Sequence, residues 1–295
     1  MSEQRLHSRF PESLYPAERK LLTDYNNKVS NGYKTASKKN VVICGICRDV
    51  SNILSKNGIP RIERLGSLFK NYHVVIYEND SKDDTPQILH DWMKSNFNVT
   101  AICETLNLPK QKQDTSYERA SALSDCRNKY LKDIKQNWLS RVDYVIVIDP
   151  DITGGWSYDG IAHSFCKPDW DFVGSNSILY QQLEVEDEIL YRRLYFDSWA
   201  YRELSHLEPH KMATINQLEF HRGRSLIKLR SCFGGVGIYR SECLRDVEYG
   251  ATQHDSGLVD CDHPFLHNQM LDKGFDKIYL NPSQITLYSP TDYCV

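Results

Sequence analysis

Apolar and polar positions fall into alternating blocks along the first half of the chain. Continuous apolar runs with the length and β-branched content of buried strands lie at 41–47, 73–77, 99–103 and 143–148. The segments between them predict helices: apolar residues have helical spacing within 51–70, Thr85-Pro86 opens a second helix, and a long pattern covers 117–134. Gly58 and Pro60 are expected to interrupt the first turns of the helix at 51–70.

This alternation predicts a single α/β domain with a Rossmann-like, mostly parallel central sheet flanked by helices. After residue 155 the order loosens into a charged stretch at 182–193, a basic one at 221–230 and strand-like pieces around 231–239 and 277–280. We therefore expect three parts. They are a polar, partly helical peripheral arm at 1–40, a first half at 41–155, and an elaboration of the same domain at 156–295.

The composition of the chain limits the partners that the protein can bind and the cell compartment in which we expect it. With 36 Lys and Arg against 39 Asp and Glu, the chain lacks the basic footprint of a nucleic-acid-binding protein. The sequence has no apolar run of membrane-spanning or signal-peptide length, so we expect a cytoplasmic protein without an integral membrane segment. Several of the nine cysteines lie in strand-like or helix-like runs, and Cys44 and Cys47 are interpreted as core thiols rather than zinc ligands.

Asp149 and Asp151 follow the most apolar of the predicted strands. Such a strand delivers both carboxylates to the sheet edge where ligands bind in open α/β folds. Two hard oxygen ligands suit Mg²⁺ or Mn²⁺, and phosphate oxygens can complete the coordination. The alternative is that these acids cap a helix beginning near Trp156, but a cap needs only one carboxylate. We favour the metal site.

Other polar groups are expected at the same edge. Arg48-Asp49 and Glu78-Asn-Asp80 end two further predicted strands, and carboxylates at the second position suit ribose hydroxyls or a base N–H. Ser81 or Asp84 is expected to cap the helix that follows.

The helix over 117–134 carries two arginines of interest. Arg127 comes four residues after Leu123 and lies on the apolar side of the helix, where it needs an anion such as a diphosphate or an acidic strand end. Arg119 lies on that side more loosely, and extension of its side chain to the surface is an equal alternative.

Two segments in the second half carry candidate chemistry. Gly234 and Gly235 stand in a strand-like run, which favours a bulge or a close approach of backbone to ligand. The segment 260–267 places Asp260, Asp262, His263 and His267 before an amphipathic run. This cluster predicts either a base and a metal ligand or the ordinary first turns of a helix, and spacing leaves both open.

Together these motifs resemble the cryptococcal-type α-1,3-mannosyltransferase family, which has a GT-A architecture. The likeness covers about residues 41–288, and this chain differs in having Asp262 where the family has Glu and Gly234 where a bulkier residue is usual. The matching segments, in chain order, are Glu78-Asn-Asp80-Ser81 with Asp83 and Thr85, Asp149-Pro-Asp151, Tyr195-Phe-Asp-Ser-Trp199, Ser231-Cys-Phe-Gly-Gly235, Asp262 with His267, and Asn281-Pro282 with Tyr288.

The resemblance implies a metal-dependent glycosyltransferase that moves a hexose, mannose being favoured, from a nucleotide diphosphate sugar to a glycan hydroxyl with retained configuration. GDP-mannose is the favoured donor and a UDP-sugar the alternative. The segment 41–155 then binds the nucleotide sugar, and 156–295 binds the acceptor and completes the catalytic site. The number of subunits stays open, with a dimer as one option.

The resemblance also assigns roles to residues. Asp149 and Asp151 hold Mn²⁺ or Mg²⁺ with His267, or His263, as a third ligand. Independently of the resemblance, we hypothesise that Arg127 assists the departing diphosphate, with Asp262 as the candidate general base if configuration is inverted. The residues expected to contact the donor are Gly45, Ile46, Arg48, Glu78, Asp80, Arg119, Arg127, Asp149, Gly234 and Gly235.

Two other functions compete with this hypothesis. Asp149-Pro-Asp151-Ile-Thr153 also fits the nucleophile motif of haloacid-dehalogenase-like phosphatases, although that motif normally ends a chain's first strand and three strand-helix units precede it here. A non-catalytic carbohydrate-binding or scaffold protein is the third option, and the retained carboxylate pair argues against it.

Overall fold

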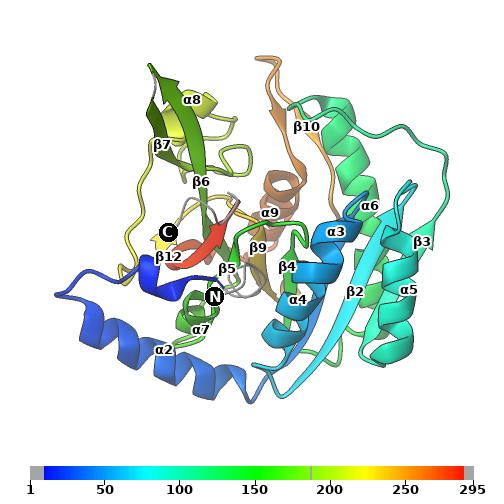
Figure 1. The fold of residues 1–295 in the computed structure, drawn as a ribbon, viewed down its shortest axis with the longest axis horizontal. Helices are drawn as coiled ribbons and strands as arrows, with labels where there is room; N and C mark the ends of the chain where they lie inside the picture. The colour runs from blue at the N-terminus through cyan, green and yellow to red at the C-terminus, as the bar shows by residue number, and fades with distance from the viewer. Residues whose placement is uncertain (1–9, 187, 289–295) are drawn as a thin grey trace.

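The computed structural model describes residues 10–186 and 188–288. Residues 1–9 of the expected arm and 289–295 of the expected C-terminal half lie outside the described residues. A central mixed sheet runs through the molecule with helices packed on both of its faces (Figure 1).

The sheet has the strand order β3-β2-β1-β4-β9-β6-β12-β5, with β7 paired to β6 and β8 to β12. Strands β1 to β4 are mutually parallel, and β9 joins them to the second half by antiparallel pairing with both β4 and β6. The strands of this sheet are β1 (Asn40–Cys47), β2 (Asn71–Asn79), β3 (Val99–Glu104), β4 (Tyr144–Ile148), β5 (Gly155–Trp156), β6 (Phe172–Val185), β7 (Glu188–Tyr195), β8 (Ile227–Lys228), β9 (Val236–Arg240) and β12 (Ile278–Leu287). A separate ribbon pairs β10 (Thr252–Gln253) with β11 (Val259–Asp260).

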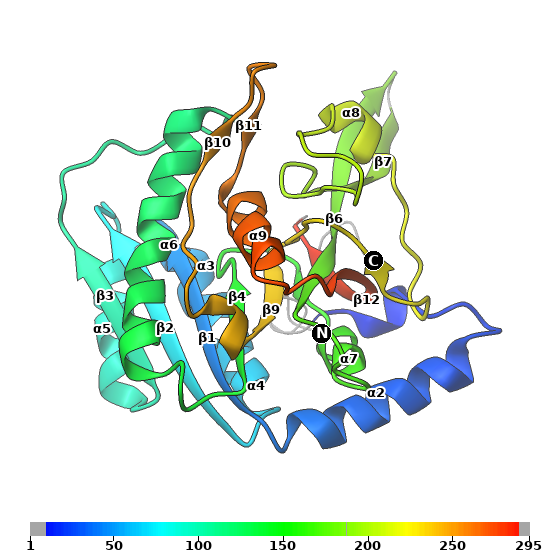
Figure 2. The ribbon, with the colours of Figure 1, turned by 180° about the vertical axis from the view of Figure 1, so that it is seen from behind.

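Alternate residues of the parallel strands enter two apolar cores, one on each face of the sheet. Helices α4 and α5 cover one face, while α6 covers the other and lies beside α9 (Figure 2). The α-helices are α2 (Leu22–Ala36), α3 (Ser51–Ile53), α4 (Ile59–Gly66), α5 (Thr85–Ser95), α6 (Tyr117–Asn137), α7 (Tyr158–Ser164), α8 (Met212–Ile215) and α9 (Asp262–Asp272). The short helical turns are η1 (Glu12–Leu14), the π-helical η2 (Leu54–Gly58) and η3 (Ser241–Leu244).

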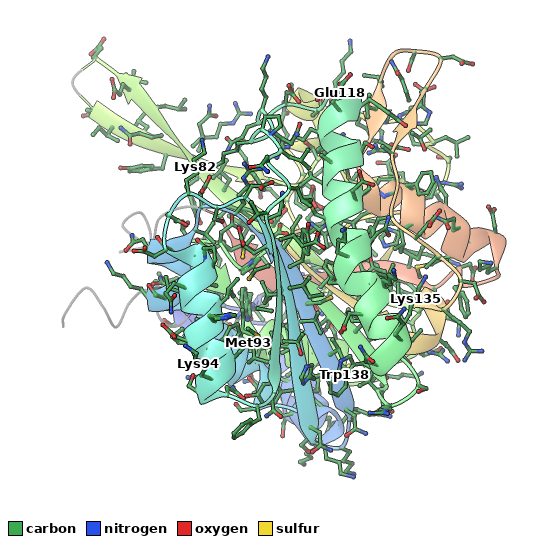
Figure 3. All side chains as sticks on the ribbon, turned by 90° about the vertical axis from the view of Figure 1, so that its right-hand side faces the viewer. Lys82, Met93, Lys94, Glu118, Lys135 and Trp138 are labelled. Atoms are coloured by element: carbon green, nitrogen blue, oxygen red, sulfur yellow. The ribbon has the colours of Figure 1, made fainter. Side chains whose placement is uncertain are left out.

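Helix α6 runs along the strands of the sheet, from one end of the strands to the other. In Figure 3 it runs from Glu118, near the edge where Lys82 follows β2, to Trp138 at the opposite edge. There the ring of Trp138 stacks on His73 of β2 with centroids 3.7 Å apart. The edge near Lys82 therefore carries the carboxyl ends of the parallel strands.

These elements confirm the predicted α/β fold class, and the four predicted strands and the helices between them are all present. Helical hydrogen bonding shifts to a π-helical turn over η2, just before Pro60, as its missing N–H leads one to expect. Asp84 is the N-cap residue of α5, one of the two expected, but its side chain makes no capping hydrogen bond, and the Asp83 carboxylate accepts the Thr85 N–H instead. At α7 the capping side chain is Ser157.

The arm is less peripheral than the sequence suggested. Phe10 is buried, and the Glu12 carboxylate accepts hydrogen bonds from the Ser157 hydroxyl and from Arg222. Helix α2 packs along α7, where Tyr25 stacks on His163. Residues 10–40 thus brace the second half of the domain.

No helix in the described part of the chain is both long enough and apolar enough to cross a bilayer. Cys44 and Cys47 are buried free thiols, as predicted for core cysteines.

Candidate active site

The carboxyl ends of β1, β2 and β4 lie at one edge of the sheet because these strands are parallel neighbours. Asp149 follows the last residue of β4, and its backbone N–H donates to the Gly235 carbonyl at 2.9 Å. Its carboxylate contacts Arg127 Nη2 at 3.3 Å through Oδ1 and accepts the Tyr288 hydroxyl at 2.8 Å through Oδ2. Two residues on, Asp151 is exposed to solvent.

The carboxylate pair carries negative charge that the protein compensates only in part. Burial raises the pKa of Asp149 to about 7, and the charge of Asp151 adds to the rise although Arg127 and Tyr288 oppose it. The pKa of Asp151 is also raised, by burial under the surrounding chain, even though its side chain reaches solvent. Within residues 10–186 and 188–288, Asp151 forms no ion pair. A cation at this point would relieve the unfavourable charge.

Arg127 is the buried cation behind the pair. It is 5% exposed, and it reaches Asp149, Asp262 and the Tyr130 hydroxyl. Its guanidinium also lies over the rings of Phe233 and Tyr249, 5.2 and 5.8 Å from their centroids. Although burial lowers it, the pKa of Arg127 stands well above its usual value because Asp262 and Asp149 favour the charged form. Arg127 therefore lies on the core side of α6, as its spacing predicted.

Asp262 is the first residue of α9 and is buried against Arg127. This position does not suit the general base expected from the sequence, because a base must reach an acceptor hydroxyl. The arrangement makes Asp262 the counter-ion that holds Arg127 in place.

Arg61 fixes the turn that follows the carboxylate pair. It is 1% exposed on α4 and donates to the backbone carbonyls of Ile152 and Thr153 at 2.6 and 2.9 Å. Sequence reasoning missed it, although its position four residues before the buried Leu65 placed it on the inner face of the helix.

Gly234 and Gly235 approach the site for packing reasons. A Cβ on Gly235 would lie 2.3 Å from the Tyr288 hydroxyl, so glycine is required where Tyr288 reaches Asp149. The Gly234 N–H donates to Asp197 Oδ2 at 2.7 Å. Burial raises the pKa of Asp197 despite this hydrogen bond and one from Ala200. Asp197 and Tyr288 belong to motifs noted in the sequence, but no role was predicted for them.

The second acidic segment holds a loop. Asp80 accepts the N–H groups of Leu106, Asn107 and Leu108 at 2.7, 2.8 and 3.1 Å. Against a rise from burial, hydrogen bonds from Asn79 and this loop lower the pKa of Asp80 to about 2. Glu78 is buried and accepts the Ser81 N–H at 2.7 Å.

Arg48, the residue after β1, donates to two carbonyls of the same loop, those of Leu108 and Pro109, at 2.9 and 3.3 Å. Gly45 lies beneath the carboxylate pair, where a Cβ would come within 2.5 Å of the Ile148 carbonyl oxygen. The side chain of Ile46 is partly buried against the core on the α6 side. These residues shape the edge of the sheet, and donor contacts by them stay a prediction.

Arg119 takes the surface alternative. Its guanidinium donates to the Asp114 carbonyl at 2.7 Å and lies 5.6 Å from the ring centroid of Trp199. Unlike Arg127, Arg119 forms no ion pair with Asp149 or Asp151 in the described residues.

The structure does not support a histidine as third metal ligand. Both ring nitrogens of His267 are engaged, Nδ1 by the Ser231 hydroxyl at 2.8 Å and Nε2 by the Tyr239 hydroxyl at 3.0 Å. His263 Nδ1 also bonds Tyr239, and its Nε2 is buried without a partner. Among the described residues no three His, Cys, Asp or Glu side chains converge as a metal site.

The sheet with its carboxylate-bearing edge is the α/β architecture that the sequence predicted. The comparisons with known proteins identify the family. The family model described as Cryptococcal mannosyltransferase 1 matches residues 40–267, which is most of the chain, and the chain belongs to this family. A search of curated proteins finds no significant match.

Several solved glycosyltransferase structures are similar in fold at low identity. A mannosyltransferase from Pyrobaculum calidifontis, in complex with GDP-Man and Mn²⁺, is 11% identical, with 91% of this chain and 66% of that one covered and a TM-score of 0.47. GalNAc-T7 with UDP, GalNAc and Mn²⁺ is 9% identical, with 85% and 44% covered and a TM-score of 0.44. Residues 1–349 of S. aureus TarS are 13% identical, with 86% and 62% covered and a TM-score of 0.41. The chain thus spans less than two thirds of the length of these proteins.

Proposed function

We propose that this member of the family transfers a hexose, with mannose favoured, from a nucleotide diphosphate sugar to a hydroxyl of a carbohydrate acceptor. The observation that carries the proposal is the carboxylate pair of Asp149 and Asp151, in which one acid is exposed without an ion-pair partner and the other has a pKa raised to about 7. Family membership favours a glycosyltransferase over the phosphatase alternative. The retained carboxylate pair favours an enzyme over a non-catalytic scaffold.

The donor set fits a hard divalent cation. Asp151 is the open ligand, while Asp149 is already oriented by Arg127 and Tyr288 and keeps further lone pairs on its oxygens. These two residues would hold Mn²⁺ or Mg²⁺. Such an ion, when bound, supplies positive charge for a departing diphosphate.

The chain's own residues prepare this site. Arg127 fixes one carboxylate, Asp262 fixes Arg127, and Arg61 fixes the turn after Asp151, so each is a positioning residue. The buried Arg127–Asp262 pair excludes water behind the carboxylates. Rigid placement of charged groups before reaction is the largest single source of catalytic stabilisation in many enzymes.

The proposed reaction is a substitution with retention. The acceptor oxygen bonds to the anomeric carbon on the face from which the diphosphate leaves, the bond from that carbon to the phosphate oxygen breaks, and the hydroxyl proton passes to the released phosphate oxygen. The burial of Asp262 supports this route, because it removes the carboxylate that inversion would have used as a base.

Ligand binding tests the donor class. We expect GDP-mannose with Mn²⁺ to raise the melting temperature in a panel of GDP and UDP sugars, by the equivalent of about 2.7 kcal/mol at a hundredfold excess over Kd. The matched control is Asp151→Asn with the same ligands. If no nucleotide sugar shifts the melting of the wild-type protein with either metal, the proposal is wrong.

A further inference from the structure

The ribbon formed by β6 and β7 projects from the body of the molecule (Figures 1 and 2). Apolar side chains are exposed towards its outer end. Leu183 on β6 is 37% exposed, and Ile189 and Leu190 on β7 are 56% and 46% exposed. Charged residues stand among them on β7, where both Glu188 and Arg192 are exposed. Neither takes part in an ion pair within the described residues.

Strand β7 is an edge strand. In the described part of the chain it pairs with β6 and with no other strand. Because side chains alternate between the faces of a strand, Glu188, Leu190 and Arg192 share one face, and Leu183 joins them through its pairing with Leu190. An exposed edge with apolar side chains is a template for another strand.

We propose that this edge binds a second copy of the chain, with β7 pairing antiparallel to β7 of the second copy about a two-fold axis at Leu190. The residue order supports this occupant. In this register Leu190 faces its own counterpart, and Glu188 of each copy faces Arg192 of the other. The strand is therefore self-complementary in charge.

The same axis also completes the apolar surface. Leu183 and Leu190 of one copy continue into Leu190 and Leu183 of the other across four adjacent strands, on the face that carries both charge pairs. A two-fold axis moved by one residue would set Leu190 against Arg192 and leave Glu188 without an opposite charge. The register is thus specified by three positions on one strand.

Cross-strand pairs contribute only about 0.2 to 1 kcal/mol each, so the dimer is expected to be concentration-dependent rather than permanent. Sedimentation velocity over a dilution series of the full chain measures it. We expect Glu188→Arg and Arg192→Glu each to weaken self-association at least about tenfold, because each places like charges face to face. The double variant restores the pairing and should return close to the wild-type value.

Glu184→Arg is the matched control. It makes the same charge change on an exposed residue of β6 whose side chain lies on the other face, and it should leave self-association unchanged. A wild-type chain that is monomeric throughout the series, or a double variant no better than the single ones, would overturn the proposal. Both results are independent of donor binding, which the melting assay reports separately.

Cross-linking tests the register directly. A cysteine replacing Leu190 would lie opposite itself at the Cα separation of an antiparallel pair, about 4.5 to 5.5 Å, which a disulfide can span. Leu190→Cys is therefore expected to form a covalent dimer under mild oxidation, and Tyr191→Cys and the wild-type chain are not. Preferential linkage through Tyr191→Cys would contradict the proposed axis.

Discussion

Two acidic segments lie at the same edge of the sheet, and the pKa values of their carboxylates are shifted in opposite directions. After β2, Asp80 and Asp83 accept backbone N–H groups, and these hydrogen bonds overcome burial and lower the pKa of each to about 2. After β4, the pKa of Asp149 is raised to about 7. One segment has its charge satisfied by the chain, and the other keeps charge that an outside cation can neutralise.

The difference teaches that a carboxylate at a strand end is not by itself a ligand site. The segment after β2 ties the loop at 106–108 to the sheet and so acts on structure. After β4, Asp149 shares the buried cation Arg127 with Asp262, and Asp151 projects to solvent. Three substitutions, two of them with matched control variants, and one pH titration can break or sharpen this contrast.

The largest effect is expected from Arg127→Leu. Loss of this cation leaves Asp149 and Asp262 near one another without compensation, and removal of one partner from a buried ion pair lowers the free energy of unfolding by about 3 to 5 kcal/mol. Arg119→Leu on the same helix is the control and should cost less than about 1 kcal/mol. If urea titrations gave equal losses in the free energy of unfolding for the two variants, Arg127 would not be the residue that compensates the buried acids of the site.

Asp151→Asn is expected to lower sugar transfer by about 100- to 1,000-fold, because a preorganised charge at the reacting centre is lost. Its free energy of unfolding should stay near that of the wild type, since the side chain is exposed. Asp84→Asn, an exposed acid of the other segment, is the control for both assays. Full activity of Asp151→Asn in the presence of EDTA would rule out the metal role.

Metal affinity should depend on pH through Asp149. Its folded pKa of about 7 lies above the ordinary 3.8, so the metal-free protein loses stability from this group as pH rises between those values. A metal needs the carboxylate form and must displace the proton below pH 7. We expect Mn²⁺ affinity to rise about tenfold per pH unit up to about pH 7 and then level off, as measured by calorimetry. A flat profile would place the metal elsewhere.

The smallest effect is expected from a substitution in the acidic segment that follows β2. Asp83 accepts the backbone N–H groups of Ser51 and Thr85, and Asp83→Asn should lower the free energy of unfolding by about 1 kcal/mol. Because the pKa of Asp83 is lowered to about 2, its contribution is present above pH 3.8 and is lost as pH falls towards 2. The Mn²⁺ affinity of Asp83→Asn should equal that of the wild type. A clear loss of affinity would show that the segment after β2 also contributes to metal binding.

The sequence by itself determined the local features of this protein. Apolar period and length placed β1 to β4 and the helices between them. The position of Asp149 and Asp151 after a buried strand placed them at the carboxyl ends of the parallel strands. The spacing from Leu123 put Arg127 on the inner face of α6. These inferences succeed because burial and backbone geometry repeat with a short period along the chain.

Only the tertiary structure decided which partner each polar group has. It joined Asp262 to Arg127, gave both nitrogens of His267 to hydroxyl groups, and tied Asp80 to the loop at 106–108. The charged stretch at 182–193 forms part of the β6–β7 ribbon. Its polar composition gave no sign of these strands in the sequence. A hydrogen bond or ion pair between distant residues leaves no periodic trace in the chain, because its partner is chosen by the packing of whole elements.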